Sequence, residues 1–450
     1  MKRKAFLILS VISMVLGACG NAAAPSLPGE PTVSQSRPAV SEPTQDVPAE
    51  STSQPTQDAP GGSTAQPVGD SDDRNPSDPY AQASYFIDTI YAQNGANTIV
   101  SPLSLNLALG LVAEGASGQT AEELYAYLGG SNYREEASEY LQYAQNLTPK
   151  TDTGLLESPY TFRYQLANSV WVNENRKLQD SFREAVQTYY QAQAQAVDFK
   201  TDTDKTAKKI NAWCKEKTNG LIPEIVTPNM LSEDLATILI NSLYFESPWQ
   251  DSWNCREHDF TNFAGDSDTR EMLFAGIGTY YENDRATAFA QNYYNGFRFI
   301  GILPKEEGEF TISDLDLQSL LASETKEYDV RACMPKLNFE TSTMSKSINR
   351  ILQAQGVKLA FDRNHSELDG MIEMEPGEVT YIDDILQKCK IELDENGTRA
   401  AAVTAIFTKC ESAAIEKPKE VKEVYLDRPF AFLIYDSLYD KILFVGKVIE

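Results

Sequence analysis

A run of small side chains near the C-terminal end constrains this chain more than any other feature. Residues 395–405 read Glu-Asn-Gly-Thr-Arg-Ala-Ala-Ala-Val-Thr-Ala. At the two-residue period of a strand, one face carries only small side chains: Thr398, Ala400, Ala402 and Thr404. The other face carries Arg399, Ala401 and Val403. A strand whose side chains on one face are this small can insert between two existing strands. Gly397 before it provides a hinge. The pattern predicts a segment that moves and then pairs within a sheet.

Residues 1–19 are organised like a bacterial secretion signal. A basic head of Lys2, Arg3 and Lys4 precedes an apolar stretch, residues 5–16, that is too short to span a membrane. Residues 16–19 read Leu-Gly-Ala-Cys and resemble the bacterial lipobox, in which the leader is cut before the cysteine and the cysteine is lipidated. We therefore expect a lipid anchor at Cys19 on the extracellular face of a bacterial membrane. The alternative is a plain secretory leader and a secreted protein.

Residues 20–79 form a segment without aromatic residues that is rich in Pro, Ser, Thr, Gln and Asp. Such a composition cannot bury enough apolar surface to fold, so we expect a disordered linker. A flexible chain of this length would span about 40–45 Å. No second linker follows, and residues 80–450 are therefore predicted to form one folded domain.

Composition and motifs argue against several classes of protein. The net charge of −26 disfavours nucleic-acid partners. Cys214, Cys255, Cys333, Cys389 and Cys410 are widely scattered, which suggests neither a disulfide scaffold nor a metal site. The chain has two histidines, in polar segments that we expect to be loops, and lacks both a Gly-x-Ser-x-Gly motif and a phosphate-binding glycine loop. We therefore expect no enzyme activity, no catalytic residues, no bound metal and no cofactor.

Local patterns predict an α+β fold, because helices and strands do not alternate regularly. Ser101 and Pro102 should open a helix that runs to Val112, and Thr120 with Glu123 should form a capping box for the next helix. Residues 204–217 are predicted to be helical and to stop at Asn219-Gly220. The apolar run 236–245 suggests a strand buried on both faces, and residues 430–435 and 442–449 suggest a closing antiparallel pair.

Six sequence blocks within residues 80–450 resemble blocks of the serpin family, in the same order. They are Asn97–Ser104, Leu166–Ser169, Leu239–Phe245 with Trp249, Met334–Lys336, Asp427–Phe430 and Phe444–Val448. The segment of small residues resembles the hinge of the serpin reactive-centre loop. The resemblance implies a single domain with three β-sheets, eight or nine helices and an exposed reactive-centre loop.

The resemblance also implies a function. A serpin presents its loop as bait to a serine protease, which cuts the loop and becomes acylated. The loop then inserts into the main sheet and traps the enzyme. We therefore expect a monomeric inhibitor of extracellular serine proteases. The alternative is a non-inhibitory surface binding protein with the serpin fold.

The hinge residues that the resemblance marks are Glu395, Gly397, Thr398, Ala400, Ala401 and Ala402. We expect Thr398 to be the first side chain to insert and the native loop to lie wholly outside the sheet. Threonine is small and favours strands, which supports an inhibitor over a non-inhibitory member. Arg399 stands where the family usually has Glu, and we expect it on the outward face, where its charge should be tolerated.

A buried polar network is implied around Asn241, whose amide needs partners in an apolar strand. In serpins the matching Asn contacts serines and a histidine beneath the opening sheet. Ser101 and Ser104 match those serines, whereas Gln387 occupies the histidine position. Gln can also donate and accept hydrogen bonds, although a core amide without a gating role is the alternative. Trp249 matches the tryptophan under the top of the sheet, and plain core packing explains it equally well.

The sequence leaves more than one candidate for the bond that the protease cuts. Counting from Glu395 as the family does leads to Glu411–Ser412, and the register could shift within residues 408–414. Glu411 would select glutamyl-specific proteases, and Lys409 would select trypsin-like ones. Ser412 or Ala413 would suit elastase-like enzymes. Cys410 beside the bond could act in redox control or be an inert small residue.

Overall fold

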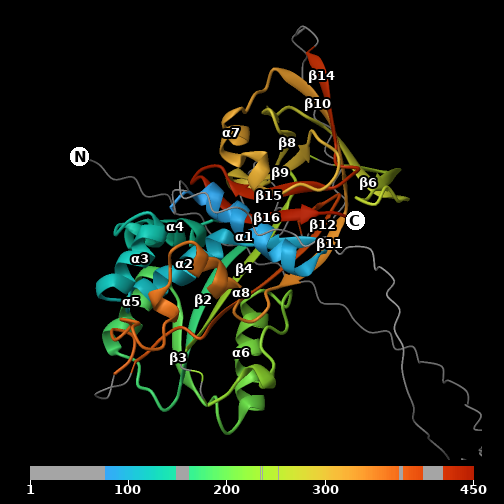
Figure 1. Cartoon of the computed structure of the whole chain (residues 1–450). Coiled ribbons are helices and arrows are strands. Elements are labelled where there is room, and N and C mark those ends of the chain that lie inside the picture. Colours follow the sequence, from blue (N-terminus) through green and yellow to red (C-terminus); the bar gives the residue numbers. More distant parts are fainter. Residues whose placement is uncertain are drawn as a thin grey trace, which may run out of the picture. The chain divides into compact units, whose positions relative to one another are not determined.

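The structure is a computed structural model that describes residues 77–147, 162–233, 235, 237–251, 253–373, 379–398 and 419–450. Within these residues the chain forms eight α-helices and three β-sheets (Figure 1). The helices are α1 Pro79–Asn94, α2 Pro102–Ala113, α3 Gly118–Leu128, α4 Tyr133–Gln145, α5 Asp180–Tyr190, α6 Thr203–Lys217, α7 Leu317–Ala322 and α8 Ser347–Ala354. The expected α+β fold with three sheets is confirmed.

The largest part of the candidate site lies in a six-stranded sheet, called here the main sheet. Its strand order is β11 Leu337–Ser342, β12 Asp384–Asp394, β13 Gly397–Thr398, β4 Thr237–Pro248, β2 Arg163–Asn173 and β3 Gln193–Val197. Strand β4 pairs antiparallel with β2 over ten residues, and β12 pairs antiparallel with β11. The main sheet therefore has two halves, β11–β12 and β4–β2–β3, with the two-residue strand β13 between them.

The described residues form two further sheets. A second six-stranded sheet has the order β1 Thr98–Val100, β16 Lys441–Val448, β15 Phe430–Asp436, β9 Phe297–Pro304, β8 Ala286–Asn292 and β7 Tyr280–Glu282. A four-stranded sheet has the order β14 Glu420–Tyr425, β10 Tyr328–Pro335, β6 Ser267–Ile277 and β5 Asn254–Thr261. The predicted closing pair is confirmed as β15 and β16, which pair antiparallel.

Strand β4 is buried along its whole length because the main sheet is covered on both faces. Helix α6 packs against β2 and β4 on one face (Figure 1), where Trp171, Trp213 and Ile240 share an apolar cluster. Leu239 and Leu243 point the other way, into the main core. The apolar run of the sequence therefore correctly indicated a strand covered on both sides.

The helix boundaries confirm most of the sequence predictions and correct one. Ser101 caps α2 by accepting a hydrogen bond from the Ser104 backbone N–H at 3.3 Å. The predicted capping box of Thr120 and Glu123 is wrong, because α3 begins earlier, at Gly118. The Glu367 carboxylate accepts from the Thr120 N–H at 3.1 Å, while Glu123 accepts from the backbone of the segment before residue 360. A carboxylate distant in sequence therefore does the capping.

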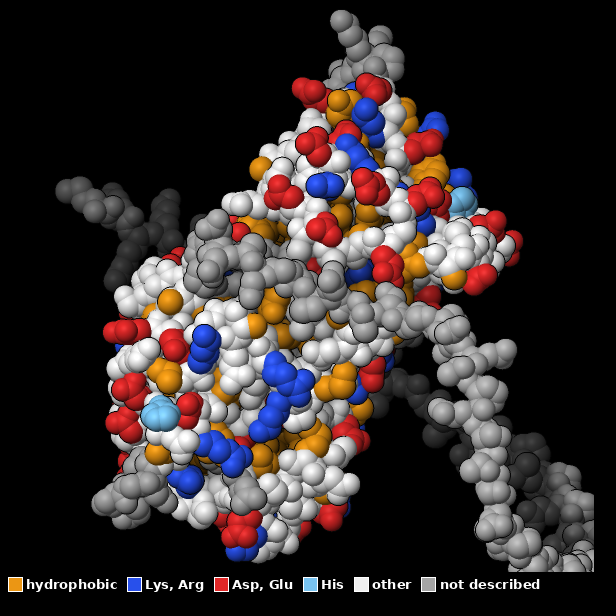
Figure 2. Space-filling model, viewed as in Figure 1, with side chains coloured by type: hydrophobic (Ala, Val, Ile, Leu, Met, Phe, Trp, Pro, Cys, Tyr) orange, Lys and Arg blue, Asp and Glu red, His pale blue; other side chains and the backbone are white. Residues whose placement is uncertain are grey.

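The visible surface carries acidic and basic side chains together with small separate apolar areas (Figure 2). Among the described residues, the large apolar side chains that are exposed are Met344, Val421 and Leu438. None of the described helices is long and apolar enough to cross a membrane.

Candidate functional site: the hinge and the slot in the main sheet

The first two residues of the hinge already form a strand inside the main sheet. Thr398 is paired with Leu393 of β12 on one side and with Ser247 of β4 on the other. Gly397 pairs in the same way with Asp394 and Pro248. The Thr398 side chain is only 4% exposed. The expectation that the native loop lies wholly outside the sheet is therefore wrong for these two residues.

A buried tyrosine accounts for the position of Thr398. The Tyr293 hydroxyl and the Thr398 hydroxyl form a hydrogen bond of 2.5 Å. Tyr293 is fully buried, and burial raises the pKa of its phenol well above the usual value, so the group stays neutral. A buried hydroxyl without a partner is costly, and Thr398 provides that partner. Tyr293 lies between β8 and β9, and no local sequence pattern predicts this role.

Gly397 is required by the space around it as well as by its backbone angle. Its φ is +151°, a backbone conformation that residues other than glycine rarely adopt. A Cβ at this position would lie 2.3 Å from the Ser247 carbonyl oxygen. Only glycine therefore lets the chain pass this close to β4, which supports its predicted role as the hinge.

Trp249 holds the turn that leads from β12 into β13. Its indole Nε1 donates to the Asp394 carbonyl at 2.9 Å, and its backbone N–H donates to the Asn396 carbonyl at 3.0 Å. Its ring stacks on Tyr293 with centroids 4.2 Å apart and planes at 15°. Trp249 is thus more than core filler, because it contacts both the turn and the tyrosine that binds Thr398.

Glu395 is tied to the body of the protein by an ion pair. The Lys336 ammonium lies 2.8 Å from the Glu395 carboxylate and 2.7 Å from Glu271 on β6. The hydrogen bond from Lys336 is the main reason that the pKa of Glu395 is lowered. The start of the hinge is therefore linked through one lysine to the four-stranded sheet.

Below β13, the two halves of the main sheet enclose a slot. Strands β4 and β12 pair directly, in parallel, only from residues 238–241 to residues 384–387. Between this seam and β13, residues 242–246 of β4 face residues 388–392 of β12, and no described strand lies between them. Where β13 separates them, β4 and β12 are two strand spacings apart, or about 9.5 Å. The two walls of the slot therefore diverge from one strand spacing at the seam to two strand spacings at β13.

The predicted polar network lies at the bottom of the slot. The Gln387 amide donates to the Asn241 Oδ1 and to the Ser101 carbonyl, each at 2.9 Å, and its Oε1 accepts from the Ser101 N–H at 2.9 Å. The Ser104 hydroxyl donates to the same Asn241 oxygen at 3.1 Å. All four residues are buried. Gln387 therefore bonds across the seam between β12 and β4, which is the bond that must break if the seam opens.

Several predicted residues lie outside the described residues. They are Cys19, Arg399, Ala400, Ala401, Ala402, Lys409, Cys410, Glu411, Ser412 and Ala413. The histidines are described, and one expectation about them is wrong. His258 lies in strand β5 rather than in a loop, and its Nε2 is 3.1 Å from an Asp427 carboxylate oxygen. His365 is exposed and contacts Asp362.

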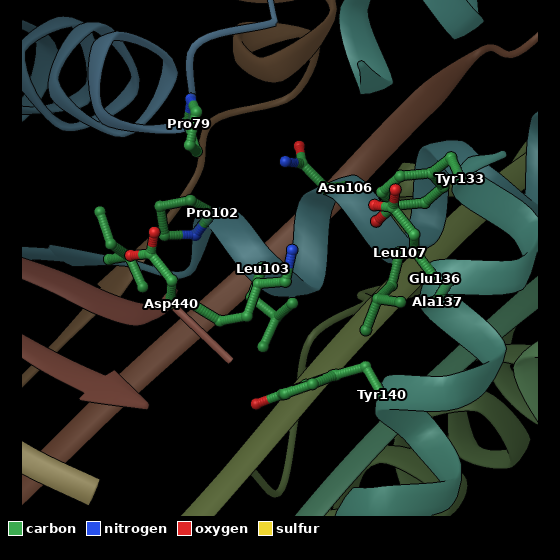
Figure 3. A pocket seen from close by; sticks show the side chains of 12 residues that line it. Pro79, Pro102, Leu103, Asn106, Leu107, Tyr133, Glu136, Ala137, Tyr140 and Asp440 are labelled. Atoms are coloured by element: carbon green, nitrogen blue, oxygen red, sulfur yellow. The ribbon is translucent and has the colours of Figure 1, made fainter. Parts of the chain in front are cut away.

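A pocket at the start of α2 does not add a ligand site. Pro102 and Leu103 of α2 and Tyr140 of α4 face this pocket, with Asp440 at its edge (Figure 3). Its cavity volume is about 60 Å³. Pockets for small organic ligands usually measure about 300–1,000 Å³, so this one holds a few waters at most.

Comparison with known proteins identifies the class to which this fold and this hinge belong. The family model described as Serpin (serine protease inhibitor) matches residues 83–450, and the chain therefore belongs to the serpin family. Serpins are generally protease inhibitors rather than enzymes, so membership supports an inhibitor-type function in general terms.

Particular relatives agree with this assignment. A serpin-like protein of Thermococcus kodakarensis is 31% identical over 372 residues, which cover 80% of this chain and 82% of the relative. Iripin-3 of Ixodes ricinus is 28% identical over 366 residues, covering 79% and 89%. The native-state crystal structure of Tengpin, a thermophilic serpin, matches with a TM-score of 0.69 and 27% identity, covering 83% of this chain and 94% of Tengpin. Serpin48 of the insect Tenebrio molitor matches with a TM-score of 0.69 and 26% identity, covering 85% and 100%.

Proposed function

We propose that this chain is an extracellular inhibitor of serine proteases that is consumed in one reaction. The protease cuts the reactive-centre loop, forms an acyl-enzyme with it, and is trapped when the loop inserts into the main sheet. One observation carries this proposal: β13 is the beginning of an inserted strand, and the slot continues directly from it. A passive binding module would have no need for a sheet that is held open in line with its hinge.

The pairing register of β13 fixes where each further residue would go. Thr398 faces Leu393 and Ser247, so the next five residues, 399–403, would face residues 388–392 of β12 and 242–246 of β4. Five residues therefore separate Thr398 from the first directly paired position of β4 and β12, and the walls would have to part further as these residues enter. Residue 404 would meet the pair Gln387–Asn241, and further insertion requires the polar network to open.

The free energy and the geometry of insertion are both sufficient for trapping a protease. About fifteen inserted residues at about 3.3 Å each would carry an attached enzyme roughly 50 Å. Each new backbone hydrogen bond contributes about 0.5–1.5 kcal/mol net, so pairing on two sides could release more than ~10 kcal/mol. Such a displacement distorts the acyl-enzyme before water can attack it.

The choice of protease depends on residues outside the described part of the chain. We place the cut at Glu411–Ser412, which fits a glutamyl-specific protease. Lys409 would instead admit trypsin-like enzymes, and Ser412 or Ala413 elastase-like ones. The panel of proteases in the test below must include all three classes.

We further propose that the inhibitor is held on the extracellular face of a bacterial membrane by lipid on Cys19. The support is the leader sequence alone, with residues 20–79 as a tether. The chain should fractionate with membranes, and Cys19→Ala should release it. If the unaltered chain is found wholly in the culture medium, the anchor is wrong.

The inhibitory reaction is tested by mixing the full chain with the three classes of protease. We expect an equimolar complex that survives SDS with at least one enzyme, and mass spectrometry of the released peptide then gives the bond that was cut. Cleavage of the loop without a complex across the whole panel would contradict inhibition. A chain nicked in the loop should also unfold at a much higher temperature, whereas a passive serpin-fold binding protein should not change.

A further inference from the structure

Two glutamates face the slot from opposite walls at the same level. Glu246 of β4 pairs directly with Arg163 of β2 in the sheet register. Glu392 of β12 pairs directly with Asn338 of β11. Both glutamates lie on the face that also carries Ile240 and Leu386, which contact the α6 cluster, because they alternate with the core residues Phe245 and Ile391. The top of the slot therefore has an acidic side chain on each wall.

The carboxylate of Glu246 is buried but only partly engaged. Its Oε2 accepts from Arg163 at 2.8 Å and from the Tyr244 hydroxyl at 2.8 Å. No donor in the described residues contacts its Oε1. The residue is 4% exposed, so its carboxylate has only a small area in contact with solvent. Such a group gains from a further donor.

Glu392 is more exposed and has one cationic neighbour. The Lys390 ammonium lies 2.7 Å from its Oε1. Lys390 is two residues away on the same strand face, so it approaches Glu392 along β12 and not from across the slot. Among the described residues, Lys390 is the cation that pairs with Glu392, and the Glu392 side chain is 35% exposed.

The register of β13 places residue 399 between these two glutamates. Leu393 and Ser247 flank Thr398, so Glu392 and Glu246 flank the next residue. Because side chains alternate along a strand, residue 399 would point to the face opposite Thr398, which is the face of both glutamates. In this chain, residue 399 is an arginine.

We propose that Glu246 and Glu392 form a receptor for the guanidinium of Arg399, which binds them when the loop inserts. The inserted strand would then complete a row of alternating charges across four strands: Arg163, Glu246, Arg399 and Glu392. Opposite charges directly across a sheet are favourable and like charges are not. The inference rests on the proposed insertion mechanism and makes Arg399 a positioning residue that drives the first step beyond Thr398.

The proposed row gives Arg399 a larger role than the sequence alone predicts. The sequence alone predicts only that the charge of an outward Arg399 is tolerated. With a carboxylate on each wall, Arg399→Glu would place three negative charges side by side. The usual family residue is therefore the wrong one for this slot.

The test compares three variants of the full chain with a target protease. Arg399→Gln should raise the moles of inhibitor consumed per mole of protease about threefold, and Arg399→Glu about tenfold or more, since insertion competes with deacylation. Arg399→Lys should stay close to wild type. Combining Arg399→Glu with Glu392→Lys should recover part of the loss, although either change alone is harmful. Arg183→Glu on α5, an exposed residue with the same charge change, is the matched control and should have no effect.

Two further measurements, the salt dependence of inhibition and the unfolding temperature of the nicked chain, distinguish failure of this inference from failure of the proposed function. High salt should narrow the gap between wild type and Arg399→Glu, because Glu392 is partly exposed. Each chain is also nicked in the loop with a non-target protease and its unfolding temperature is measured. If nicked wild type gains no stability, insertion itself fails. If nicked wild type and Arg399→Glu gain equally, or if Glu392→Lys rescues nothing, insertion stands and the receptor for Arg399 is refuted.

Discussion

The hydrogen bond between Tyr293 and Thr398 predicts an asymmetric response to two conservative substitutions. Thr398→Val keeps the β-branched shape and removes only the hydroxyl. It leaves the Tyr293 phenol fully buried without its partner, which costs about 1–3 kcal/mol. Tyr293→Phe removes the phenol hydroxyl and leaves the smaller Thr398 hydroxyl, at a cost of about 0.5–1.5 kcal/mol. The double variant leaves no unpaired group and should lie close to wild type.

The measurement is a double-mutant cycle on the uncleaved full chain, with urea unfolding followed by tyrosine and tryptophan fluorescence. We expect a coupling free energy of at least about 1 kcal/mol between the two positions. Thr398→Ser, which keeps a hydroxyl, is the control and should retain most of the stability.

Two results would overturn this reasoning. If Thr398→Val is as stable as wild type, Thr398 does not lie beside Tyr293 in solution, and the hinge is outside the sheet. If the double variant is as unstable as Thr398→Val alone, the loss comes from packing of the threonine and not from the orphaned phenol. Either outcome would remove the basis for the register used above.

Three further predictions address other parts of the site. Gly397→Ala should destabilise the uncleaved chain by about 2 kcal/mol or more, measured by urea unfolding, because its Cβ would meet the Ser247 carbonyl oxygen. Gln387→Leu should cost about 2–4 kcal/mol in the same assay, since it leaves the buried Ser101 N–H without an acceptor and removes one of the two donors to Asn241 Oδ1, whereas Gln387→His should cost less. Burial lowers the pKa of Lys447 from 10.5 to about 8. Between pH 8 and pH 10.5, Lys447 is therefore protonated in the unfolded chain and neutral in the native chain. Native stability should therefore rise with pH across that window relative to Lys447→Met, by at most about 3 kcal/mol, as followed by thermal unfolding.

The sequence predicts the elements of this fold well where the signal is local. The capped helix that begins after Ser101, the helix that stops at Asn219-Gly220, and the buried strand before Trp249 all follow from neighbouring residues. The capping box failed because the competing carboxylate, Glu367, is more than two hundred residues away along the chain. Local rules cannot weigh a partner that only the tertiary fold brings close.

The sequence predicted which residues form the candidate site, but it did not predict that the hinge is partly inserted in the main sheet. Motif positions brought together Asn241, Gln387, Ser101 and Ser104, and the hydrogen bonds agree with that grouping. How far the hinge is inserted depends on pairing between strands about 150 residues apart, which no local pattern encodes. Tyr293 was missed for the same reason, since an isolated tyrosine before a turn is common.

In the proposed reaction, a hinge whose first two residues already pair within the main sheet would change which step is limiting. Thr398 is fixed by two strands and by Tyr293, so the register of the incoming loop is set before any protease arrives. A slip of one residue would turn every following side chain to the wrong face, and this fixed start prevents it. On the proposed insertion, the next five residues would enter the slot, and Arg399 would meet Glu246 and Glu392 at its top. The first obstacle is then the seam where Gln387 bonds to Asn241. We therefore expect the competition between trapping and deacylation to depend more on that seam than on the hinge.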